Sequence, residues 1–304
     1  MTSASGEQFE ISHGAYRAVV TESGAALRTL THDGRDLVDG FGPDEISPGC
    51  RGQLLMPWPN RIRDGRYTWD GSEHQLPLTE PSRANASHGL VRWVAWTVAS
   101  HSATALELTY RLMAQSGYPW TLDLSIAYAL GDDGLTVTQG AVNRSGSAAP
   151  YAQGAHPYLL AGPGPISSWE VLLPAATRSL SDPERLLPVG REDVTGTDVD
   201  FREAHVLGDV GFNHAFTDLV RDSAGIATTE LRDPAAGTGV ELWVDETQPW
   251  LMVYTADDRP EPLFRRSIAV EPMTAQADAF RSGEDLVRLE PGEPFSASWG
   301  IRAS

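Results

Sequence analysis

Residues 106–112, Leu-Glu-Leu-Thr-Tyr-Arg-Leu, alternate apolar with polar side chains, and residues 122–130, Leu-Asp-Leu-Ser-Ile-Ala-Tyr-Ala-Leu, repeat the alternation. A period of two is typical of a β-strand with one buried face, because successive side chains of a strand point to opposite sides. The turn signal Gly-Asp-Asp-Gly at 131–134 then leads into Leu-Thr-Val-Thr at 135–138, which resumes the alternation. These segments predict an antiparallel ladder.

The same period recurs in short segments over most of the chain. Further strands are expected at residues 15–20, 25–31, 169–173, 239–245, 250–254, 267–271 and 295–302. Helical periodicity is weak, and only residues 275–280 are expected to form a turn or two of helix. With 29 Gly and 21 Pro separating many short strands, the sequence predicts an all-β antiparallel sandwich, formed by residues 1–304 as a single domain. The turn-rich segments 80–87, 161–168 and 174–200 are expected to be surface loops.

The charged residues exclude several classes of function. Acidic residues outnumber basic ones by 41 to 23, a formal net charge of −18, which disfavours binding to nucleic acid and to anionic membrane surfaces. All 23 basic residues are Arg, so chemistry that needs a lysine ε-amine is excluded: Schiff-base aldol cleavage, pyridoxal phosphate attachment and phosphate binding by a P-loop. We therefore expect neither a nucleic-acid nor a membrane partner.

The sequence contains no local metal or cofactor motif. None of the eight histidines lies in a His-x-His or His-Glu-x-x-His arrangement, and the glycine motifs of dinucleotide and phosphate binding and a Gly-x-Ser-x-Gly elbow are missing. The single Cys50 forms neither an intrachain disulfide nor a cysteine zinc site, and we expect an inert thiol. Residues 1–10 lack a secretory signal, and no stretch approaches ~18 apolar residues, so a cytoplasmic protein without metal is expected.

His156 and Glu271 are the strongest candidates for acid–base chemistry. His156 lies in Gly-Ala-His-Pro-Tyr at 154–158, where small neighbours and a proline with fixed φ hold the imidazole. Glu271 ends an apolar segment, Ile-Ala-Val, and precedes a proline, so its carboxylate is expected to be partly buried and either paired or functional. The structural alternative is a salt bridge from Glu271 to Arg265 or Arg266.

Arg61 and His88 are two further polar candidates. Arg61 follows the stiff segment Met-Pro-Trp-Pro-Asn at 56–60, where a guanidinium is able to donate to neutral hydroxyls. The alternative is a side chain packed on Trp58 with its head in solvent. His88 precedes Gly89, a residue type that lets a ligand approach the backbone closely. The alternative for His88 is an ordinary hydrogen-bonded surface histidine.

Five short motifs follow one another in an order that resembles one known family. They are Asn60-Arg61-Ile62, His88-Gly89, Ala155-His156-Pro157-Tyr158, Trp250-Leu251-Met252-Val253-Tyr254-Thr255 and Val270-Glu271-Pro272. The series resembles the aldose 1-epimerases, also called galactose mutarotases, over nearly the whole chain. The family resemblance implies an antiparallel β-supersandwich with a concave sugar-binding cleft.

The same resemblance implies roles for individual residues. Glu271 matches the family's general base, His156 its general acid, and His88 and Arg61 its sugar-binding histidine and arginine. The other residues expected at the sugar are Tyr158, Asn213 and Met252. No cofactor is implied, and the expected partner is a small-molecule sugar, bound by a monomer or homodimer.

Two residues depart from the family pattern. Asn213 stands in Asn-His-Ala-Phe where the family usually has Asp before the His, and Met252 stands where many members have Gln. Asn213 is still able to bond hydroxyls, whereas Met252 cannot replace an amide. The usual galactose or glucose specificity is therefore not implied.

The expected chemistry is anomeric interconversion by ring opening and reclosure. Glu271 removes the proton of the anomeric hydroxyl, protonated His156 donates to the ring oxygen, and the open aldehyde rotates about C1–C2 before it recloses. One alternative is a hexose-6-phosphate 1-epimerase with the same acid and base. Its candidate phosphate ligands are Arg61, Arg63, Arg66, Arg265 and Arg266. The other alternative is a sugar-binding sandwich that does not catalyse.

Overall fold

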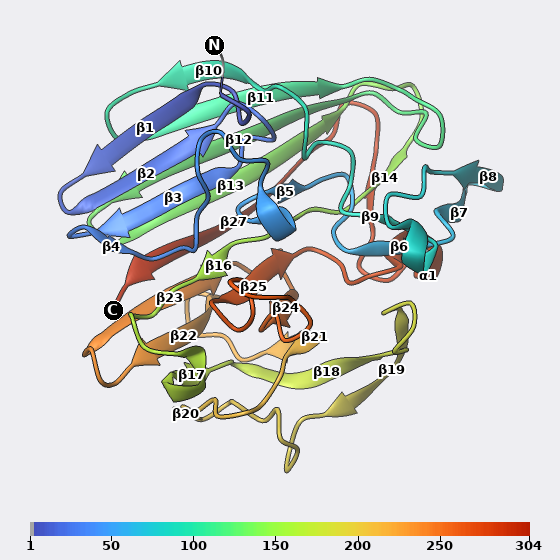
Figure 1. Cartoon of the computed structure of the whole chain (residues 1–304). Helices are drawn as coiled ribbons and strands as arrows, with labels where there is room; N and C mark the ends of the chain where they lie inside the picture. The colour runs from blue at the N-terminus through green and yellow to red at the C-terminus, as the bar shows by residue number, and fades with distance from the viewer. Residues whose placement is uncertain (1–2) are drawn as a thin grey trace.

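The computed structural model describes residues 3–304, and the predicted ladder lies in the upper part of the molecule in the view of Figure 1. It consists of β11 (Ala105–Leu112), β12 (Leu122–Gly131) and β13 (Gly134–Asn143). All three pair antiparallel, with Leu108 opposite Ile126 and Ile126 opposite Gln139. Apolar side chains alternate into the core along these strands, as the period of two predicts.

The ladder forms one half of a nine-stranded sheet. Within residues 3–304 the strand order is β10-β11-β12-β13-β27-β23-β22-β17-β20. The strands not yet described are β10 (Thr97–His101), β17 (Glu170–Leu172), β20 (His205–Val206), β22 (Ala227–Asp233), β23 (Thr238–Val244) and β27 (Pro294–Ala303). β27 pairs with β13 on one side and with β23 on the other, and so joins the two halves of the sheet.

A second large sheet lies beside the first and carries the segments with the candidate motifs. Its order is β19-β18-β21-β24-β25-β15-β5, with β16 also paired to β25. The bounds are β5 (Leu54–Leu55), β15 (Gly154–Ala155), β16 (Tyr158–Leu159), β18 (Ala175–Ser181), β19 (Pro188–Asp193), β21 (Asn213–Leu219), β24 (Trp250–Tyr254) and β25 (Ile268–Met273). Every residue of β24 and β25 is buried, as expected for central strands covered on both faces.

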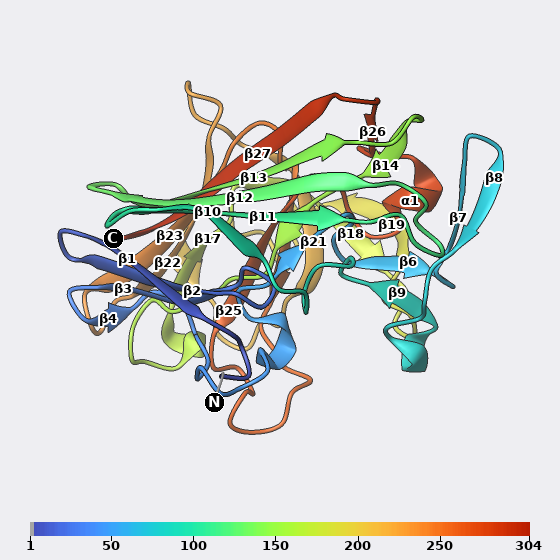
Figure 2. The same ribbon diagram turned by 90° about the horizontal axis from the view of Figure 1, so that it is seen from above.

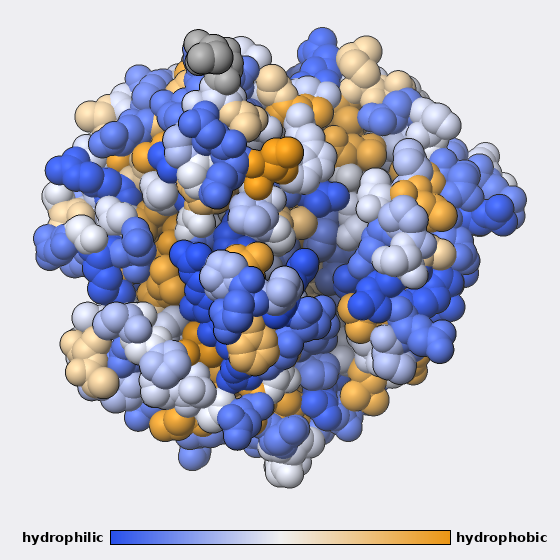
Figure 3. Space-filling view, in the orientation of Figure 1, coloured by the Kyte–Doolittle hydropathy of each residue, from blue (hydrophilic) through white to orange (hydrophobic). Residues whose placement is uncertain are grey.

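Smaller sheets complete the structure. Figures 1 and 2 show the sheet of β1 (Gln8–His13), β2 (Tyr16–Thr21), β3 (Leu27–His32) and β4 (Arg35–Asp36) packed against one face of β11–β13. The two-stranded pairs are β6 (Arg61–Arg63) with β9 (Asn85–Ser87), β7 (Arg66–Trp69) with β8 (Ser72–Gln75), and β14 (Ala149–Tyr151) with β26 (Val287–Leu289). The short helix α1 (Ala279–Ser282) lies near β6 and β7. The face shown in Figure 3 is mostly hydrophilic with small apolar groups.

The all-β antiparallel prediction is confirmed, with differences in three segments. The expected loop at 174–200 contains β18 and β19, whose mixed polar composition hides the alternation. The expected loop at 80–87 contains a 3-10 turn, Pro81–Arg83, and β9. The helical turn expected at 275–280 begins later, at Ala279. In the part of the chain that is described, no helix is long and apolar enough to cross a membrane.

Candidate active site

Strand pairing brings His156 and Glu271 together. β15 and β16 both pair with β25, and His156 lies in the two-residue connection between them, while Glu271 lies within β25. The imidazole is therefore held beside the strand that carries the carboxylate. Nε2 of His156 lies 3.3 Å from Oε1 of Glu271. Both residues are buried, with 6% of His156 and 2% of Glu271 exposed.

The alternative in which Glu271 forms a salt bridge with Arg265 or Arg266 is wrong. Nη1 of Arg265 donates to Asp257 at 2.6 Å, and Nη2 of Arg266 lies 3.0 Å from Oδ1 of Asp39. Glu271 instead contacts His156. Its partner is a titratable group, as acid–base chemistry requires.

Burial determines the protonation of this pair in the protein without sugar. Removal from water raises the pKa of Glu271 to about 8, although the positive charge of Arg61 opposes this rise. Burial also lowers the pKa of His156 to about 3, and the next largest cause is the positive charge of Arg51. At neutral pH the pair therefore holds one proton, which resides on Glu271. The expected roles require that proton on His156 instead.

Each member of the pair also keeps one unsatisfied polar atom. Nδ1 of His156 and Oε2 of Glu271 are buried and have no hydrogen-bond partner among residues 3–304. Most buried polar atoms in proteins are bonded, and an unbonded one costs roughly 1–3 kcal/mol. Unsatisfied buried groups of this kind occur at catalytic residues.

A cleft of about 250 Å³ contains both residues of the pair. Its volume is just below the roughly 300–1,000 Å³ of pockets for drug-sized ligands, which suits a single sugar ring. All seven residues predicted from the sequence line it: Arg61, His88, His156, Tyr158, Asn213, Met252 and Glu271. The fold therefore gathers into one cavity residues that are spread over most of the chain.

Arg61 is held in the cleft wall by Glu80. Nε donates to Oε2 at 2.7 Å and Nη2 donates to Oε1 at 3.0 Å, so the carboxylate binds the guanidinium through two parallel hydrogen bonds. Nη1 also donates to Oδ1 of Asn60 at 3.3 Å. The alternative of a head in solvent is wrong, because the Arg61 side chain is only 15% exposed. Its remaining N–H groups are oriented by these three bonds.

His88 lies next to His156 and is fixed in one tautomer. Its Nδ1 accepts the backbone N–H of Asn60 at 3.2 Å, so Nε2 carries the proton of the neutral ring. Burial lowers the pKa of His88 well below its ordinary value, and the neighbouring His156 adds to this effect. The two rings meet edge to face with centroids 5.6 Å apart. His88 therefore acts as a neutral donor in this cleft.

Gly89 is needed for backbone packing, whereas the sequence suggested that it lets a ligand approach. Its φ is +70°, and a Cβ at this position would collide with the backbone carbonyl of Met56. The glycine is therefore required by the packing of two backbone segments. No ligand approach is needed to explain it.

Tyr158 supports His156 through its ring. The two rings are stacked, with centroids 4.9 Å apart and an angle of 11° between their planes. The Tyr158 hydroxyl donates to the carbonyl of Gly49 at 3.0 Å. Because that hydroxyl is already bonded to the backbone, the ring face is the part of Tyr158 that matters most to the site.

Asn213 and Met252 line the wall formed by β21 and β24. Asn213 begins β21 and pairs with Tyr254, while Met252 pairs with Ala215 on one side and with Glu271 on the other. Met252 therefore places a thioether directly beside the strand position of the carboxylate. At Met252, in contrast to Asn213, a sugar hydroxyl meets a group that is at best a weak acceptor.

A comparison with protein families decides to which family the chain belongs. The model of the family described as aldose 1-epimerase matches residues 7–302. The chain belongs to the aldose 1-epimerase family. The expected family and fold are confirmed, and so is the expected class of enzyme, an isomerase that acts on carbohydrates.

Relatives and solved structures agree with this family. The uncharacterized protein YihR of Escherichia coli K12 is 34% identical, over 98% of this chain and 93% of its own length. Galactose mutarotase of Sus scrofa is 31% identical, over 88% of this chain and 82% of its own length. A GalM/aldose epimerase homologue from C. elegans superimposes with a TM-score of 0.86 at 18% identity, covering 98% of each chain. A putative aldose 1-epimerase from E. coli K12 gives 0.83 at 23% identity, covering 98% of this chain and 99% of its own. At these identities the structural likeness shows the fold alone.

Several residues that line this cleft were not predicted from the sequence. Cys50 lines it, and its Sγ accepts Nη1 of Arg92 at 3.1 Å. Burial raises the pKa of the Cys50 thiol, which keeps it neutral and agrees with an inert group. The other unpredicted lining residues with polar side chains are Asn60, Glu80, Arg83, Tyr254, Asp258 and Arg259. They come from loops and strand ends with no distinctive pattern, although Asn60 and Tyr254 belong to motifs that the resemblance used.

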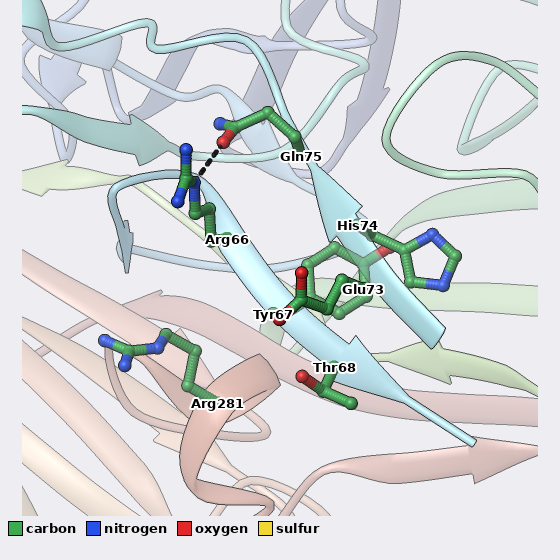
Figure 4. Close-up of a pocket in the computed structure, with 7 residues that line it drawn as sticks. All are labelled: Arg66, Tyr67, Thr68, Glu73, His74, Gln75 and Arg281. Atoms are coloured by element: carbon green, nitrogen blue, oxygen red, sulfur yellow. Dashed lines mark hydrogen bonds between the residues drawn. The ribbon is translucent and has the colours of Figure 1, made fainter. Parts of the chain in front are cut away.

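The arginines expected to converge on a phosphate do not do so. Of the five, only Arg61 lines the cleft. Arg66 lies in a different hollow on the β7–β8 hairpin, where its Nε donates to Oε1 of Gln75 at 2.7 Å. Figure 4 draws this hydrogen bond as a dashed line. Arg63 lies 3.8 Å from Asp278, and Arg265 and Arg266 bind the partners described above. Arg83 and Arg259 line the cleft instead.

Metal binding has no support in the geometry. Among residues 3–304, no group of three or more His, Cys, Asp or Glu side chains is placed to hold a metal ion. The family resemblance implies no cofactor, and the chemistry described below uses side chains only.

Proposed function

We propose that the protein is an aldose 1-epimerase that interconverts the α and β anomers of a free hexopyranose. The observation that carries this proposal is the contact of 3.3 Å between Nε2 of His156 and Oε1 of Glu271, buried in a cleft of sugar size. Anomeric interconversion needs one group that takes a proton and one that gives a proton at two oxygens bonded to the same carbon. Two side chains in contact meet that requirement.

Ring opening needs one proton transfer at each of the two oxygens bonded to C1. Ionised Glu271 takes the proton of the anomeric hydroxyl, the C1=O1 bond forms as the bond from C1 to the ring oxygen breaks, and protonated His156 gives its proton to that oxygen. Rotation about C1–C2 turns the aldehyde. In reclosure neutral His156 takes back the hydroxyl proton as the oxygen attacks C1, and Glu271 returns its proton to O1.

The empty cleft has the protonation that this scheme assigns to the open-chain sugar. Burial keeps the proton on Glu271, as described above. Binding of the closed ring therefore requires a transfer of that proton from Oε1 to Nε2, between atoms already in contact. The other hydrogen-bonding groups of the cleft hold the ring meanwhile, and the donors are the Arg61 N–H groups left free by Glu80 and Asn60, together with the Nε2–H of His88.

The cleft wall and the relatives indicate which sugars to test first. Galactose and glucose are the first substrates to test, because a relative that is 31% identical is a galactose mutarotase. A hexose 6-phosphate is the second candidate, because Arg83 and Arg259 line the cleft. Glu80 and Asp258 line it too and weaken any preference for an anion.

Exchange NMR at anomeric equilibrium tests the proposal. We expect wild-type protein to accelerate the exchange of α and β anomers of galactose or glucose, and the Glu271→Gln variant to lose this acceleration. Glu107→Gln, an exposed glutamate on β11 outside the cleft, is the matched control and should behave as wild type.

Two other results would redirect the assignment. Acceleration of anomeric exchange for glucose 6-phosphate alone, and not for free sugars, would identify a phosphosugar epimerase. Binding of a free sugar without acceleration of its anomeric exchange would contradict catalysis and identify a sugar-binding protein.

A further inference from the structure

Arg51 and Asp39 form a buried ion pair near His156 that the proposed reaction does not use. Nε and Nη2 of Arg51 both donate to Oδ2 of Asp39, at 3.1 and 2.8 Å, and Nη1 donates to the carbonyl of Pro48 at 2.9 Å. The side chains of Arg51 and Asp39 are 4% and 0% exposed. Removing two charges from water is expensive, and apolar residues of similar volume often serve stability as well or better. A buried ion pair therefore calls for a reason other than stability.

Arg51 touches the ring on which His156 is stacked. The guanidinium carbon lies 4.3 Å from the centroid of the Tyr158 ring, within the range of a cation–π contact. The same ring stacks on the His156 imidazole at 4.9 Å. Arg51, Tyr158 and His156 thus form a continuous series of packed planar groups that ends at Glu271.

Backbone hydrogen bonds tie the segment of Arg51 to His156. The N–H of Gly52 donates to the carbonyl of His156 at 2.9 Å, and the N–H of His156 donates to the carbonyl of Gln53 at 3.0 Å. The Tyr158 hydroxyl is bonded to Gly49 in the same segment. Movement of Arg51 is therefore transmitted to the imidazole through both the ring stack and the backbone.

Asp39 holds Arg51 in place. Its Oδ2 also accepts the hydroxyl of Ser267 at 2.8 Å, and Arg266 approaches Oδ1. Ser267 directly precedes β25, the strand that carries Glu271. The Asp39 carboxylate therefore links the start of β25, the strand that carries Glu271, to the guanidinium of Arg51.

The charge of Arg51 acts on His156 as well. The titratable and charged groups around the imidazole are Glu271 and His88, which touch it, Tyr158, which stacks on it, and the cations Arg51, Arg92 and Arg259, which act through space. Of the three cations, Arg51 has the largest influence. Its charge disfavours a protonated imidazole and so makes that imidazole a stronger acid.

We propose that Arg51 is a positioning residue of the epimerase reaction, which orients His156 through the ring of Tyr158 and is itself held by Asp39. This inference rests on the proposed function for its catalytic consequence. Its structural consequence, a change in the orientation and titration of His156, is measurable without any substrate.

The first test replaces the planar group and keeps the charge. Arg51→Lys retains a cation beside Asp39 but loses the flat face against Tyr158. We expect kcat to fall about tenfold or more with KM changed less than threefold, because the sugar still binds while the acid is misplaced. The control is Arg221→Lys, a partly buried arginine that donates to the backbone carbonyls of residues 225, 244, 245 and 248, and it should leave both constants unchanged.

A double-mutant cycle tests whether Arg51 acts through Tyr158. Tyr158→Leu removes the ring between Arg51 and His156, so Arg51→Lys should have little further effect on kcat in its presence. Additive losses would overturn the proposal. A kcat of Arg51→Lys within twofold of wild type would overturn it too, even if thermal unfolding shows a loss of stability.

Imidazole ¹⁵N NMR of the empty protein tests the charge effect. In the paired variant Arg51→Gln/Asp39→Asn, both buried charges are removed together, so no lone carboxylate remains. We expect His156, which is neutral in wild type down to low pH, to begin protonation at higher pH in the variant. An unchanged titration would overturn the inference even if wild type proves to be an active epimerase. If wild type accelerates no sugar, a shifted titration would still support the placement of Arg51.

Discussion

Oε1 of Glu271 and Nε2 of His156 lie 3.3 Å apart, and at neutral pH the one proton of this buried pair resides on Glu271. The two residues come from different segments that meet only because β15 and β16 flank the same strand, β25. A pair with a single proton always contains one acid and one base. Both directions of an anomeric interconversion are then served by moving that proton between two atoms.

Loss of either partner should reduce turnover much more than sugar binding. We expect Glu271→Gln and His156→Ala to lower kcat by roughly 10²- to 10⁴-fold, because each removes one member of the acid–base pair. KM should stay within a few fold, since the proposed sugar contacts of Arg61 and His88 remain. Exchange NMR at several sugar concentrations separates the two constants. Near-normal kcat in either variant would contradict the assignment.

The pH dependence of the reaction should have its alkaline limit near the pKa of Glu271. The pair keeps one proton between the two pKa values, about 3 and about 8, and has none above the higher one. We therefore expect kcat/KM to be level at neutral pH and to fall about tenfold per pH unit above about pH 8. Rates must be corrected for the uncatalysed reaction at each pH. A single break near the ordinary histidine pKa of ~6.5 would instead indicate an exposed, independent imidazole.

Glu271→Gln should make the protein more stable at alkaline pH. The pKa of Glu271 is raised from 4.5 to about 8 by folding, so the stability that this group contributes is complete below 4.5 and is lost as pH rises through 8. The variant avoids this loss, and we expect it to gain roughly 4 kcal/mol over wild type at pH 8 and less than about 0.5 kcal/mol at pH 4.5.

Urea unfolding of both proteins at pH 4.5, 6.5 and 8 measures this difference. His156 makes a contribution of the opposite sign, lost as pH falls from 6.5 towards 3, but both proteins share it. Exposed Glu107→Gln should show no pH-dependent gain. A difference between Glu271→Gln and wild type that does not vary with pH would show that Glu271 is not held protonated.

Glu80→Gln should weaken sugar binding through Arg61. The amide keeps one acceptor for the guanidinium and loses the charge and the second parallel bond, so Arg61 is less well oriented. We expect KM to rise about tenfold and kcat to change less than threefold. Glu230→Gln is the control, because Glu230 binds Nε of Arg232 at 2.6 Å on β22, outside the cleft. A fall in kcat at constant KM would place Arg61 on the transition state instead.

Met252→Gln should improve binding of a sugar with a hydroxyl at the β21–β24 wall. The new amide adds a donor and an acceptor beside Glu271, and one hydrogen bond is worth about 1 kcal/mol, or about fivefold in KM. Comparison of galactose with glucose shows which hydroxyl is involved. Met113→Gln, at a residue that is 60% exposed, should have no effect. Weaker binding of every sugar tested would indicate that the natural substrate places an apolar group against Met252.

The parts of the fold that the sequence predicted are those with a strict period. The ladder at residues 106–138 was predicted because alternate side chains enter a core that covers one face only. β18, Ala-Ala-Thr-Arg-Ser-Leu-Ser, was not predicted, because small and polar residues dominate it. It forms a strand because it pairs with β21 on one side and with β19 on the other. The single-domain organisation, the cytoplasmic location and the oligomeric state stay predictions.

The site was predictable where a residue belongs to a short motif and not where it depends on distant partners. Arg61 and His88 were identified by their neighbours in sequence. The Glu80 carboxylate that orients Arg61 and the Asn60 N–H that orients His88 were found only in the structure. Likewise no pattern around Arg51 connects it with Asp39. Such pairs are set by tertiary packing, and their members have no common local signal.

The position of β27 has a consequence for how the chain is made. This strand lies between β13 and β23, so the ribosome completes both halves of the nine-stranded sheet before it makes the strand that joins them. Until then each half has an open edge at that position, and an open edge can pair with another chain. During synthesis the protein should therefore depend on chaperones to cover these edges, and deletion of residues 294–303 should give aggregation in the cell instead of a folded protein with lower activity.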